Sequence, residues 1–148
     1  MIIQPRIRIN ICLNAHPAGC DAQVSAQINY VKTQERIKGP GKVLVIGASN
    51  GYGLAARIVS AFASDAATIG LSFEKQGNAR RTGTAGWYNI EAFRRYADAA
   101  GLPAWNINGD AFSEDTKATT LALIKDKVGQ IDFLVYSIAA PRRIDPAT

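Results

Sequence analysis

Three glycines in the first half of the chain, Gly47, Gly51 and Gly53, follow a short apolar run and precede an alanine-rich stretch. The run at 43–46 is typical of a strand buried on both faces, and the stretch from about Leu54 is typical of a helix. Glycine lets a backbone approach a pyrophosphate, and the first N–H groups of the helix face that anion. The pattern predicts a diphosphate-binding turn, while a purely steric need for glycine is the alternative.

An acidic side chain supports this interpretation. Glu74 closes a second apolar run, residues 67–73, about twenty residues beyond the turn. An acid at this place in dinucleotide-binding folds accepts hydrogen bonds from ribose hydroxyls and repels a 2′-phosphate. We therefore expect NAD(H), with a solvated surface glutamate as the alternative. Lys75, Arg80 and Arg81 could neutralise a phosphate, so NADP(H) stays open as a second reading.

Apolar strands and amphipathic helices alternate from Lys42 onward. We expect strands at 43–47, 67–73, 104–108 and 131–137, and helices at 53–63, 90–100 and from Ser113. This alternation predicts an α/β fold with a Rossmann-type, doubly wound parallel sheet. We expect the helix at 90–100 to bury Ile90, Phe93, Tyr96 and Ala97. In the next helix we expect Ser113 to be the N-cap and Leu121, Ile124 and Val128 to face inward.

Residues 1–41 are expected to be an amino-terminal strand–helix extension, followed by an incomplete NAD-binding domain at 42–148. In the extension, the pattern predicts a strand at 6–13 and a helix from Asp21, its cap, to about Lys32. Gly39 and Gly41 are expected to end that helix.

Cys12, His16 and Cys20 stand four residues apart, a spacing that could line up three metal ligands on one helix. Pro17 and Gly19 argue against a helix at that point. We therefore expect reduced thiols and no metal site, with a disulfide or a zinc site as weaker alternatives.

The composition is that of an ordinary globular protein: 148 residues, 47% hydrophobic and 20% charged, with a net charge of +5. The amino terminus lacks the apolar core of a secretory signal, and no apolar run has the length of a membrane span. We expect a cytoplasmic protein without membrane contact. The basic charge suits polyanions such as nucleic acid, dinucleotides, coenzyme A or an acidic carrier protein. Because no nucleic-acid-binding motif is present, an enzyme with a basic face is favoured.

Two further predicted strand ends carry candidate ligand contacts, since ligands lie beyond the carboxyl ends of strands in such sheets. Asp110 follows the strand at 104–108 and could accept a bond from an adenine amino group; a helix-flanking aspartate is the alternative. The small residues in the segment 137–141 would let a cofactor lie against bare backbone.

With these residues assembled, the chain resembles the amino-terminal part of the FabV-type enoyl-[acyl-carrier-protein] reductases, also called trans-2-enoyl-CoA reductases. The matching stretches are 1–8, 16–20, 43–54, 84–89, 107–112 and 135–141. They follow one another in order along nearly the whole chain, with departures only outside the glycine turn, as at Ile9 and Asn10.

The resemblance implies a fold similar to short-chain dehydrogenases, whose glycine spacing the turn shares. It also implies an NADH-dependent oxidoreductase that reduces the trans-2 double bond of enoyl-CoA or enoyl-acyl-carrier-protein thioesters in fatty acid biosynthesis. By position, the implied cofactor contacts are Gly47, Ala48, Ser49, Asn50, Gly51 and Tyr52 for the pyrophosphate and the nearby ribose, Phe73 and Glu74 for the adenosine ribose, Asp110 and Ala111 for the adenine, and Ile138 and Ala139 for the nicotinamide-side ribose. Trp87 and Tyr88 are expected to serve packing.

The catalytic Tyr and Lys of this family, with eight residues between them, are expected beyond Thr148. No lysine stands at that distance after any tyrosine of this chain. We expect an NAD-binding fragment, cut after the fourth strand, that has no catalytic residue of its own and is inactive alone. Its last strand, at 133–136, would be an exposed apolar edge. A non-catalytic dinucleotide-binding module is the alternative, and a basic nucleic-acid binder is a third hypothesis.

Overall fold

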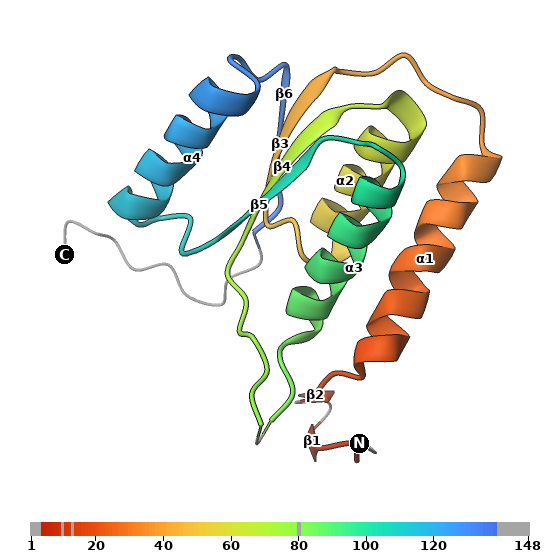
Figure 1. The fold of residues 1–148 in the computed structure, drawn as a ribbon. Helices are drawn as coiled ribbons and strands as arrows, with labels where there is room; N and C mark the ends of the chain where they lie inside the picture. Colours follow the sequence, from red (N-terminus) through yellow and green to blue (C-terminus); the bar gives the residue numbers. More distant parts are fainter. Residues whose placement is uncertain (1–3, 10, 13, 80, 139–148) are drawn as a thin grey trace.

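The computed structural model describes residues 4–9, 11–12, 14–79 and 81–138, and it shows an α/β fold (Figure 1). Its centre is a parallel sheet with the strand order β5-β4-β3-β6. The strands are β3 (Lys42–Ile46), β4 (Ala67–Ser72), β5 (Ala104–Asn108) and β6 (Phe133–Tyr136). The chain steps from β3 outward to β5 and then crosses back to place β6 on the other side of β3. This is the order of a doubly wound sheet, so the Rossmann-type prediction is confirmed.

Helices cover both faces of the sheet (Figure 1). α2 (Gly51–Ser64) and α3 (Ala85–Ala99) lie on one face, and α4 (Glu114–Lys127) lies on the other. α1 (Pro17–Thr33) packs on the outer side of α2 and α3. α2 and α3 are therefore held between the sheet and a further helix.

The core has apolar clusters on both faces of β3, as predicted for a strand buried on both sides. Val43 and Val45 are fully buried on one face. Leu44 packs on the other face with Ile69, and α4 covers this side through Ile124. A further cluster joins α1, α2 and α3; its buried members include Val24, Ile28, Leu54, Ile58, Phe62 and Phe93.

The predicted inward face of α3 is confirmed, but its predicted start is wrong. Ile90, Phe93 and Ala97 are buried, and Tyr96 packs against the same cluster. The helix begins at Ala85 instead of Ile90. The apolar periodicity used for the prediction begins at Ile90, so it missed the first turn, whose buried members Gly86 and Asn89 are not apolar side chains. α2 likewise begins at Gly51, before the predicted Gly53.

The predicted cap of α4 is confirmed. The Ser113 side chain accepts a hydrogen bond from the Thr116 amide at 3.2 Å. Val128 is buried, but Leu121 is 58% exposed, so its predicted inward position is wrong. The inward stripe runs through Thr116 and Thr120, whose short side chains were not read as core residues. Leu121 follows Thr120 directly and is rotated by about 100° around the helix.

The strand predicted at 6–13 is instead a small antiparallel hairpin of β1 (Ile7–Arg8) and β2 (Ile11–Cys12). Ile9 lies in the turn with a left-handed φ of 58°. Residues 10 and 13 lie outside the described part of the chain. The predicted extended conformation is present, but the chain reverses at the turn, so two short paired strands replace the single predicted strand.

α1 begins at Pro17 rather than at Asp21, so both the predicted cap and the predicted break are wrong. His16 is the N-cap: its Nδ1 accepts a hydrogen bond from the Gly19 amide at 3.1 Å. Pro17 at the first helical position is favourable because that residue needs no N–H donor and the proline ring presets φ. The helix ends at Thr33 with Gln34 as C-cap, which confirms the predicted end at about Lys32. The glycines 39 and 41 lie beyond this end, so the prediction that they stop the helix is wrong.

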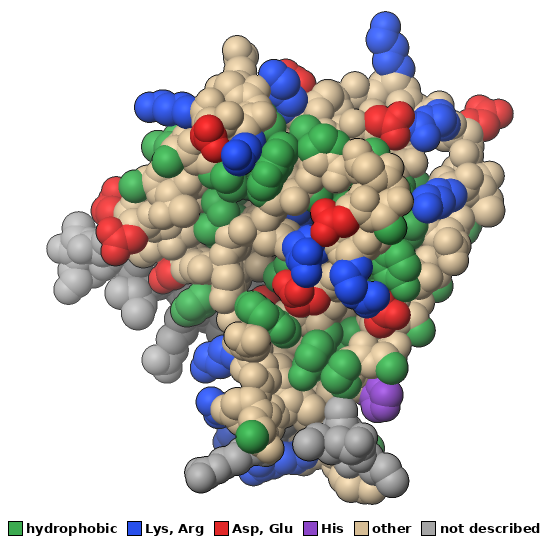
Figure 2. All heavy atoms as spheres, viewed as in Figure 1, with side chains coloured by type: hydrophobic (Ala, Val, Ile, Leu, Met, Phe, Trp, Pro, Cys, Tyr) green, Lys and Arg blue, Asp and Glu red, His purple; other side chains and the backbone are tan. Residues whose placement is uncertain are grey.

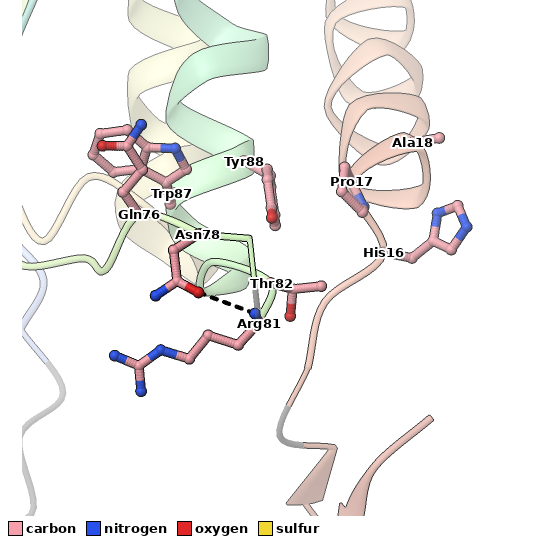
Figure 3. Close-up of a pocket in the computed structure, with 10 residues that line it drawn as sticks. His16, Pro17, Ala18, Gln76, Asn78, Arg81, Thr82, Trp87 and Tyr88 are labelled. Atoms are coloured by element: carbon pink, nitrogen blue, oxygen red, sulfur yellow. Dashed lines mark hydrogen bonds between the residues drawn. The ribbon is translucent and has the colours of Figure 1, made fainter. Parts of the chain in front are cut away.

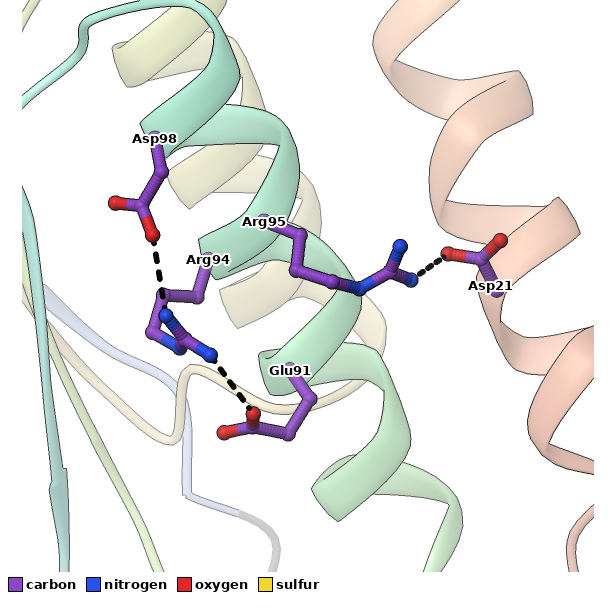
Figure 4. Close-up of polar contacts among 5 residues, drawn as sticks. All are labelled: Asp21, Glu91, Arg94, Arg95 and Asp98. Atoms are coloured by element: carbon purple, nitrogen blue, oxygen red, sulfur yellow. Dashed lines mark hydrogen bonds and ion pairs between the residues drawn. The ribbon is translucent and has the colours of Figure 1, made fainter.

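Asp21 instead connects α1 to α3 (Figure 4). Its carboxylate forms an ion pair with Arg95 and accepts a hydrogen bond from the Tyr96 hydroxyl at 3.3 Å. Arg94, beside them on α3, pairs with Glu91 and Asp98 along its own helix. Since α1 also buries Val24 and Ile28 against α2 and α3, it contributes to their core. The division of the chain after residue 41 stays a prediction.

The cysteines and the histidine near the amino terminus have local roles in the structure. The Cys12 thiol donates to the Asn14 backbone carbonyl, and His16 caps α1. Burial raises the pKa of the Cys20 thiol, which favours its protonated form. Within the described residues, no group of three His, Cys, Asp or Glu side chains is arranged to hold a metal ion.

Within the described part of the chain, no helix combines the length and the apolar character needed to cross a membrane.

Strand β6 leaves apolar side chains exposed. It pairs with β3 along one edge, and Phe133, Leu134 and Tyr136 on it are more than half exposed. The predicted exposure of apolar side chains on this strand is confirmed.

Arg57 is a fully buried charge that sequence reasoning did not single out. It rises from α2 and donates to Thr68 Oγ1 at 3.3 Å, Asn106 Oδ1 at 2.5 Å and the Trp105 carbonyl at 2.8 Å. Its guanidinium also stacks 4.3 Å from the Phe93 ring centroid. Burial lowers the pKa of Arg57 to about 9. One side chain thus ties α2 to β4, β5 and α3.

We expect Arg57→Ala to lower the free energy of unfolding by roughly 2–5 kcal/mol, because it opens a cavity and leaves buried acceptors without donors. Urea denaturation measures the loss. Arg94→Ala is the control: its partners are exposed, so the change should be within about 0.5 kcal/mol. Equal losses in both variants would contradict a supporting role for Arg57.

Candidate functional site

The glycine turn lies between β3 and α2, at the carboxyl edge of the sheet. Gly47 and Gly51 both have left-handed backbones, with φ of 87° and 51°. The amides of Gly47 and Ala48 donate to the Leu71 carbonyl at 2.8 and 3.1 Å. These bonds fix the turn to β4, so the amides of Gly47 and Ala48 are already used within the sheet.

Close backbone contacts explain two of the three glycines. A Cβ on Gly47 would lie 2.0 Å from the Ser137 carbonyl oxygen, and a Cβ on Gly53 would lie 2.0 Å from the Gly47 carbonyl oxygen. The steric alternative is therefore correct for Gly47 and Gly53. It is compatible with anion binding, because the same contacts bring the start of α2 down to the strand ends.

The amino-terminal end of α2 has the geometry of an anion site. Asn50 occupies the N-cap position with an extended backbone, yet its side chain makes no capping hydrogen bond. The amides of Gly51, Tyr52 and Gly53 have no intrahelical acceptor because they form the first turn. Together with the positive end of the helix dipole, they favour a phosphate group.

Glu74 lies at the end of β4 and is joined to the glycine turn. Its Oε1 accepts a hydrogen bond from Ser49 Oγ at 2.5 Å, and its Oε2 accepts one from Thr84 Oγ1. Its backbone is held by Asn108 through bonds of 2.8 and 3.0 Å. The side chain is partly buried, unlike a solvated surface acid. A carboxylate has about four acceptor positions, so bonds to ribose hydroxyls remain open to it.

Gly86, in the first turn of α3, makes room for this carboxylate. A Cβ there would lie 2.1 Å from Glu74 Oε1. The Glu74 carboxylate therefore lies directly against the first turn of α3. Sequence reasoning gave no role to Thr84 or Gly86, although both lie in a stretch that carried the family resemblance.

The remaining predicted contacts lie at the ends of the neighbouring strands. Phe73 follows β4 and is 75% exposed, and Ile138 follows β6. Asp110, after β5, accepts a hydrogen bond from the Phe112 amide at 2.9 Å, the local turn expected of a helix-flanking aspartate. Ala111 lies beside it in the same turn. Ala139 lies outside the described residues. The described members thus all follow strand ends at one edge of the sheet.

Asn89, on α3, is a site residue that sequence reasoning missed. It is only 7% exposed, and its Nδ2 donates to the Ser49 carbonyl at 3.0 Å and to Asn50 Oδ1 at 2.8 Å. Its spacing to Phe93 and Ala97 places it on the inward face of the helix. The sequence could therefore predict that Asn89 faces inward, but not that its side-chain amide bonds to the glycine turn.

The pocket of Figure 3 lies between the start of α1 and the loop that precedes α3, and measures about 510 Å³. Its lining comprises His16, Pro17, Ala18, Gln76, Gly77, Asn78, Arg81, Thr82, Trp87 and Tyr88, and includes none of the predicted cofactor contacts. The Tyr88 hydroxyl accepts a hydrogen bond from the Gly83 amide at 2.8 Å. Tyr88 therefore holds the loop together, in line with its expected packing role.

Comparison with known proteins identifies the family. Residues 2–79 match the model of the NAD(P)H binding domain of trans-2-enoyl-CoA reductase, and residues 81–148 match that of the trans-2-enoyl-CoA reductase catalytic region. The chain belongs to the trans-2-enoyl-CoA reductase family. The resemblance stated from the sequence motifs is confirmed.

Relatives and solved structures agree with this assignment. The chain is 56% identical over 148 residues to the enoyl-[acyl-carrier-protein] reductase [NADH] of Methylobacillus flagellatus and covers 37% of it. It is similar to the trans-2-enoyl-CoA reductase of Clostridium acetobutulicum in complex with NADH, with a TM-score of 0.93, 47% identity, and 98% and 37% of the two chains covered. For the Treponema denticola enzyme in complex with NAD, the TM-score is 0.91 at 50% identity, with 100% and 39% covered. The chain therefore spans little more than a third of these relatives.

We expect Gly53→Ala to lower the free energy of unfolding by about 1–3 kcal/mol, because the new Cβ would collide with the Gly47 carbonyl. Gly19→Ala is a matched control, since Gly19 is also the third residue of its helix and its added Cβ would meet only ordinary contacts of 3.6 Å or more. That control should be neutral or stabilising by up to about 1 kcal/mol. Thermal melting of both variants makes the comparison, and similar effects would refute the crowding at Gly53.

Proposed function

We propose that this chain is the NAD(H)-binding part of an NADH-dependent oxidoreductase that reduces the trans-2 double bond of enoyl thioesters in fatty acid biosynthesis. The observation that carries the proposal is the hydrogen bond between Ser49 in the glycine turn and Glu74 at the end of β4. It joins a diphosphate-type turn and a ribose-type acid into one surface at the switch point of the sheet.

The proposed contacts follow the order of a dinucleotide across the strand ends. Residues 47–52 would hold the diphosphate, Phe73 and Glu74 the adenosine ribose, Asp110 and Ala111 the adenine, and Ile138 and Ala139 the ribose next to the nicotinamide. When bound, NADH supplies a hydride for C3 of the enoyl thioester. The residues of this chain bind and orient the cofactor, and Glu74 repels a 2′-phosphate and so favours NADH over NADPH.

The acid that stabilises the enolate has no candidate in this chain. We place the catalytic Tyr and Lys in the part of the family sequence that this chain does not span, so the chain alone would be inactive. The proposed substrates are enoyl-CoA or enoyl-acyl-carrier-protein thioesters, and the proposed compartment is the cytoplasm.

A non-catalytic dinucleotide-binding module is the second candidate, favoured by the lack of a Tyr–Lys pair in the sequence. A nucleic-acid or membrane partner is not part of the proposal. On the face shown in Figure 2, basic and acidic side chains are interspersed over the helices, which is unlike the one-signed stripe of a nucleic-acid-binding surface.

Calorimetric titration of the chain with NADH tests the binding role. We expect one NADH per chain and no consumption of NADH when crotonyl-CoA, a short trans-2-enoyl thioester, is added. Absence of NADH binding by the folded chain would refute the proposal. Reading the coding sequence downstream of Thr148 separates the two candidates, because only the enzyme requires a Tyr and a Lys with eight residues between them.

The cofactor preference gives a second test. We expect Glu74→Ala to narrow the preference for NADH over NADPH by roughly 1–3 kcal/mol, because the change removes an acceptor for ribose hydroxyls and a repulsion of the 2′-phosphate. The ratio of the dissociation constants for NADPH and NADH measures this preference. Glu74→Gln, which removes the charge at nearly constant size, should narrow the ratio in the same direction. An unchanged ratio in both variants would mean that Glu74 does not contact the ribose.

A further inference from the structure

Asn89 reaches from α3 to the glycine turn and uses only its amide nitrogen there. The Ser49 carbonyl can only accept a hydrogen bond, so the nitrogen of Asn89 must face the turn. The second proton of that nitrogen is then available to Asn50 Oδ1, 2.8 Å away. The Asn50 amide is thereby oriented as well: its Nδ2 lies toward Ser49 Oγ at 3.4 Å.

This orientation changes what Asn50 does for α2. Asparagine at an N-cap usually accepts a hydrogen bond from the second or third amide of the helix. Here Asn50 occupies that position, but its Oδ1 is directed toward Asn89, from which it accepts a hydrogen bond, and no capping bond forms. The first-turn amides of Tyr52 and Gly53, which a capping side chain would occupy, stay available at the edge of the sheet.

We propose that Asn89 is a positioning residue of the cofactor site: it holds the Asn50 side chain away from α2, so that the first-turn amides can bind the diphosphate. The inference deepens the proposed function and rests on it. Asn89 touches the turn and not the cofactor, so it acts through Asn50. Without it, Asn50 would cap its own helix and compete with the anion for the same donors.

A set of Ala variants in the 148-residue chain tests this competition. We expect Asn89→Ala to weaken NADH binding about five- to tenfold, the equivalent of one capping bond that the anion must displace. In an Asn50→Ala background, where no side chain can cap, adding Asn89→Ala should weaken binding less than about twofold. Titration calorimetry gives the four dissociation constants. An unchanged affinity in Asn89→Ala, or the same loss in both backgrounds, would overturn the inference.

Amide spectra test the same idea without any ligand. In ¹H–¹⁵N spectra, the Tyr52 or Gly53 amide should shift and become more protected from exchange in Asn89→Ala, and this should not occur when Asn50 is also Ala. Unchanged amides would overturn the inference even if NADH binds. If the unsubstituted chain binds neither NADH nor pyrophosphate, the proposed function fails, while the spectra still decide the role of Asn89. Should Asn89→Ala lack a cooperative melt, Asn89→Leu, which is similar in size, uncharged and cannot donate, takes its place.

Discussion

The contact between the backbones of Gly47 and Gly53 is the constraint on which the rest of this site depends. A single added carbon at either glycine would enter the space of a carbonyl group 2.0 Å away. The contact lowers the first turn of α2 onto the ends of the strands. In this arrangement Ser49 donates a hydrogen bond to Glu74 across the sheet edge, and Asn89 donates one to the Ser49 carbonyl. The close backbone contact and the polar network thus occur in the same turn.

Farther along α2, the buried Arg57 side chain fixes the helix to the sheet. A guanidinium taken fully out of water is costly, as the lowering of its pKa to about 9 reflects. Three oxygen acceptors and the Phe93 ring offset part of that cost. Gly70 on β4 gives the group its space, since a Cβ there would lie 2.2 Å from the Arg57 Nη1 atom. The helix that carries the turn is therefore fixed to the sheet by a directional group as well as by apolar packing.

Much of this architecture could be predicted from local pattern. The alternation of apolar runs revealed every strand of the main sheet, and the glycine spacing with Glu74 indicated the edge where the site lies. Features that depend on partners distant in the chain could not be predicted. Asn89 is forty residues from Ser49 in sequence, and Arg57 meets Asn106 from the opposite half of the chain. Periodicity shows that such side chains face inward, but not what they meet. At α1 the failure was local, because the ring nitrogen of His16 replaced the usual cap and Pro17 suited the first helical position.

The packing of α1 has a consequence for residues far from the strand ends. Asp21 and Arg95 are partly exposed, so their ion pair adds little energy and mainly sets the alignment of the two helices, while burial of Val24 and Ile28 supplies the adhesion. The start of α3, with Thr84 as its N-cap, in turn brings Thr84, Gly86 and Asn89 against Glu74 and the glycine turn. α1 thus supports, from the outer side, the helix whose first turn contacts Glu74 and the glycine turn. A substitution in the core between α1 and α3 can therefore shift Glu74 and the glycine turn without changing any residue that contacts them.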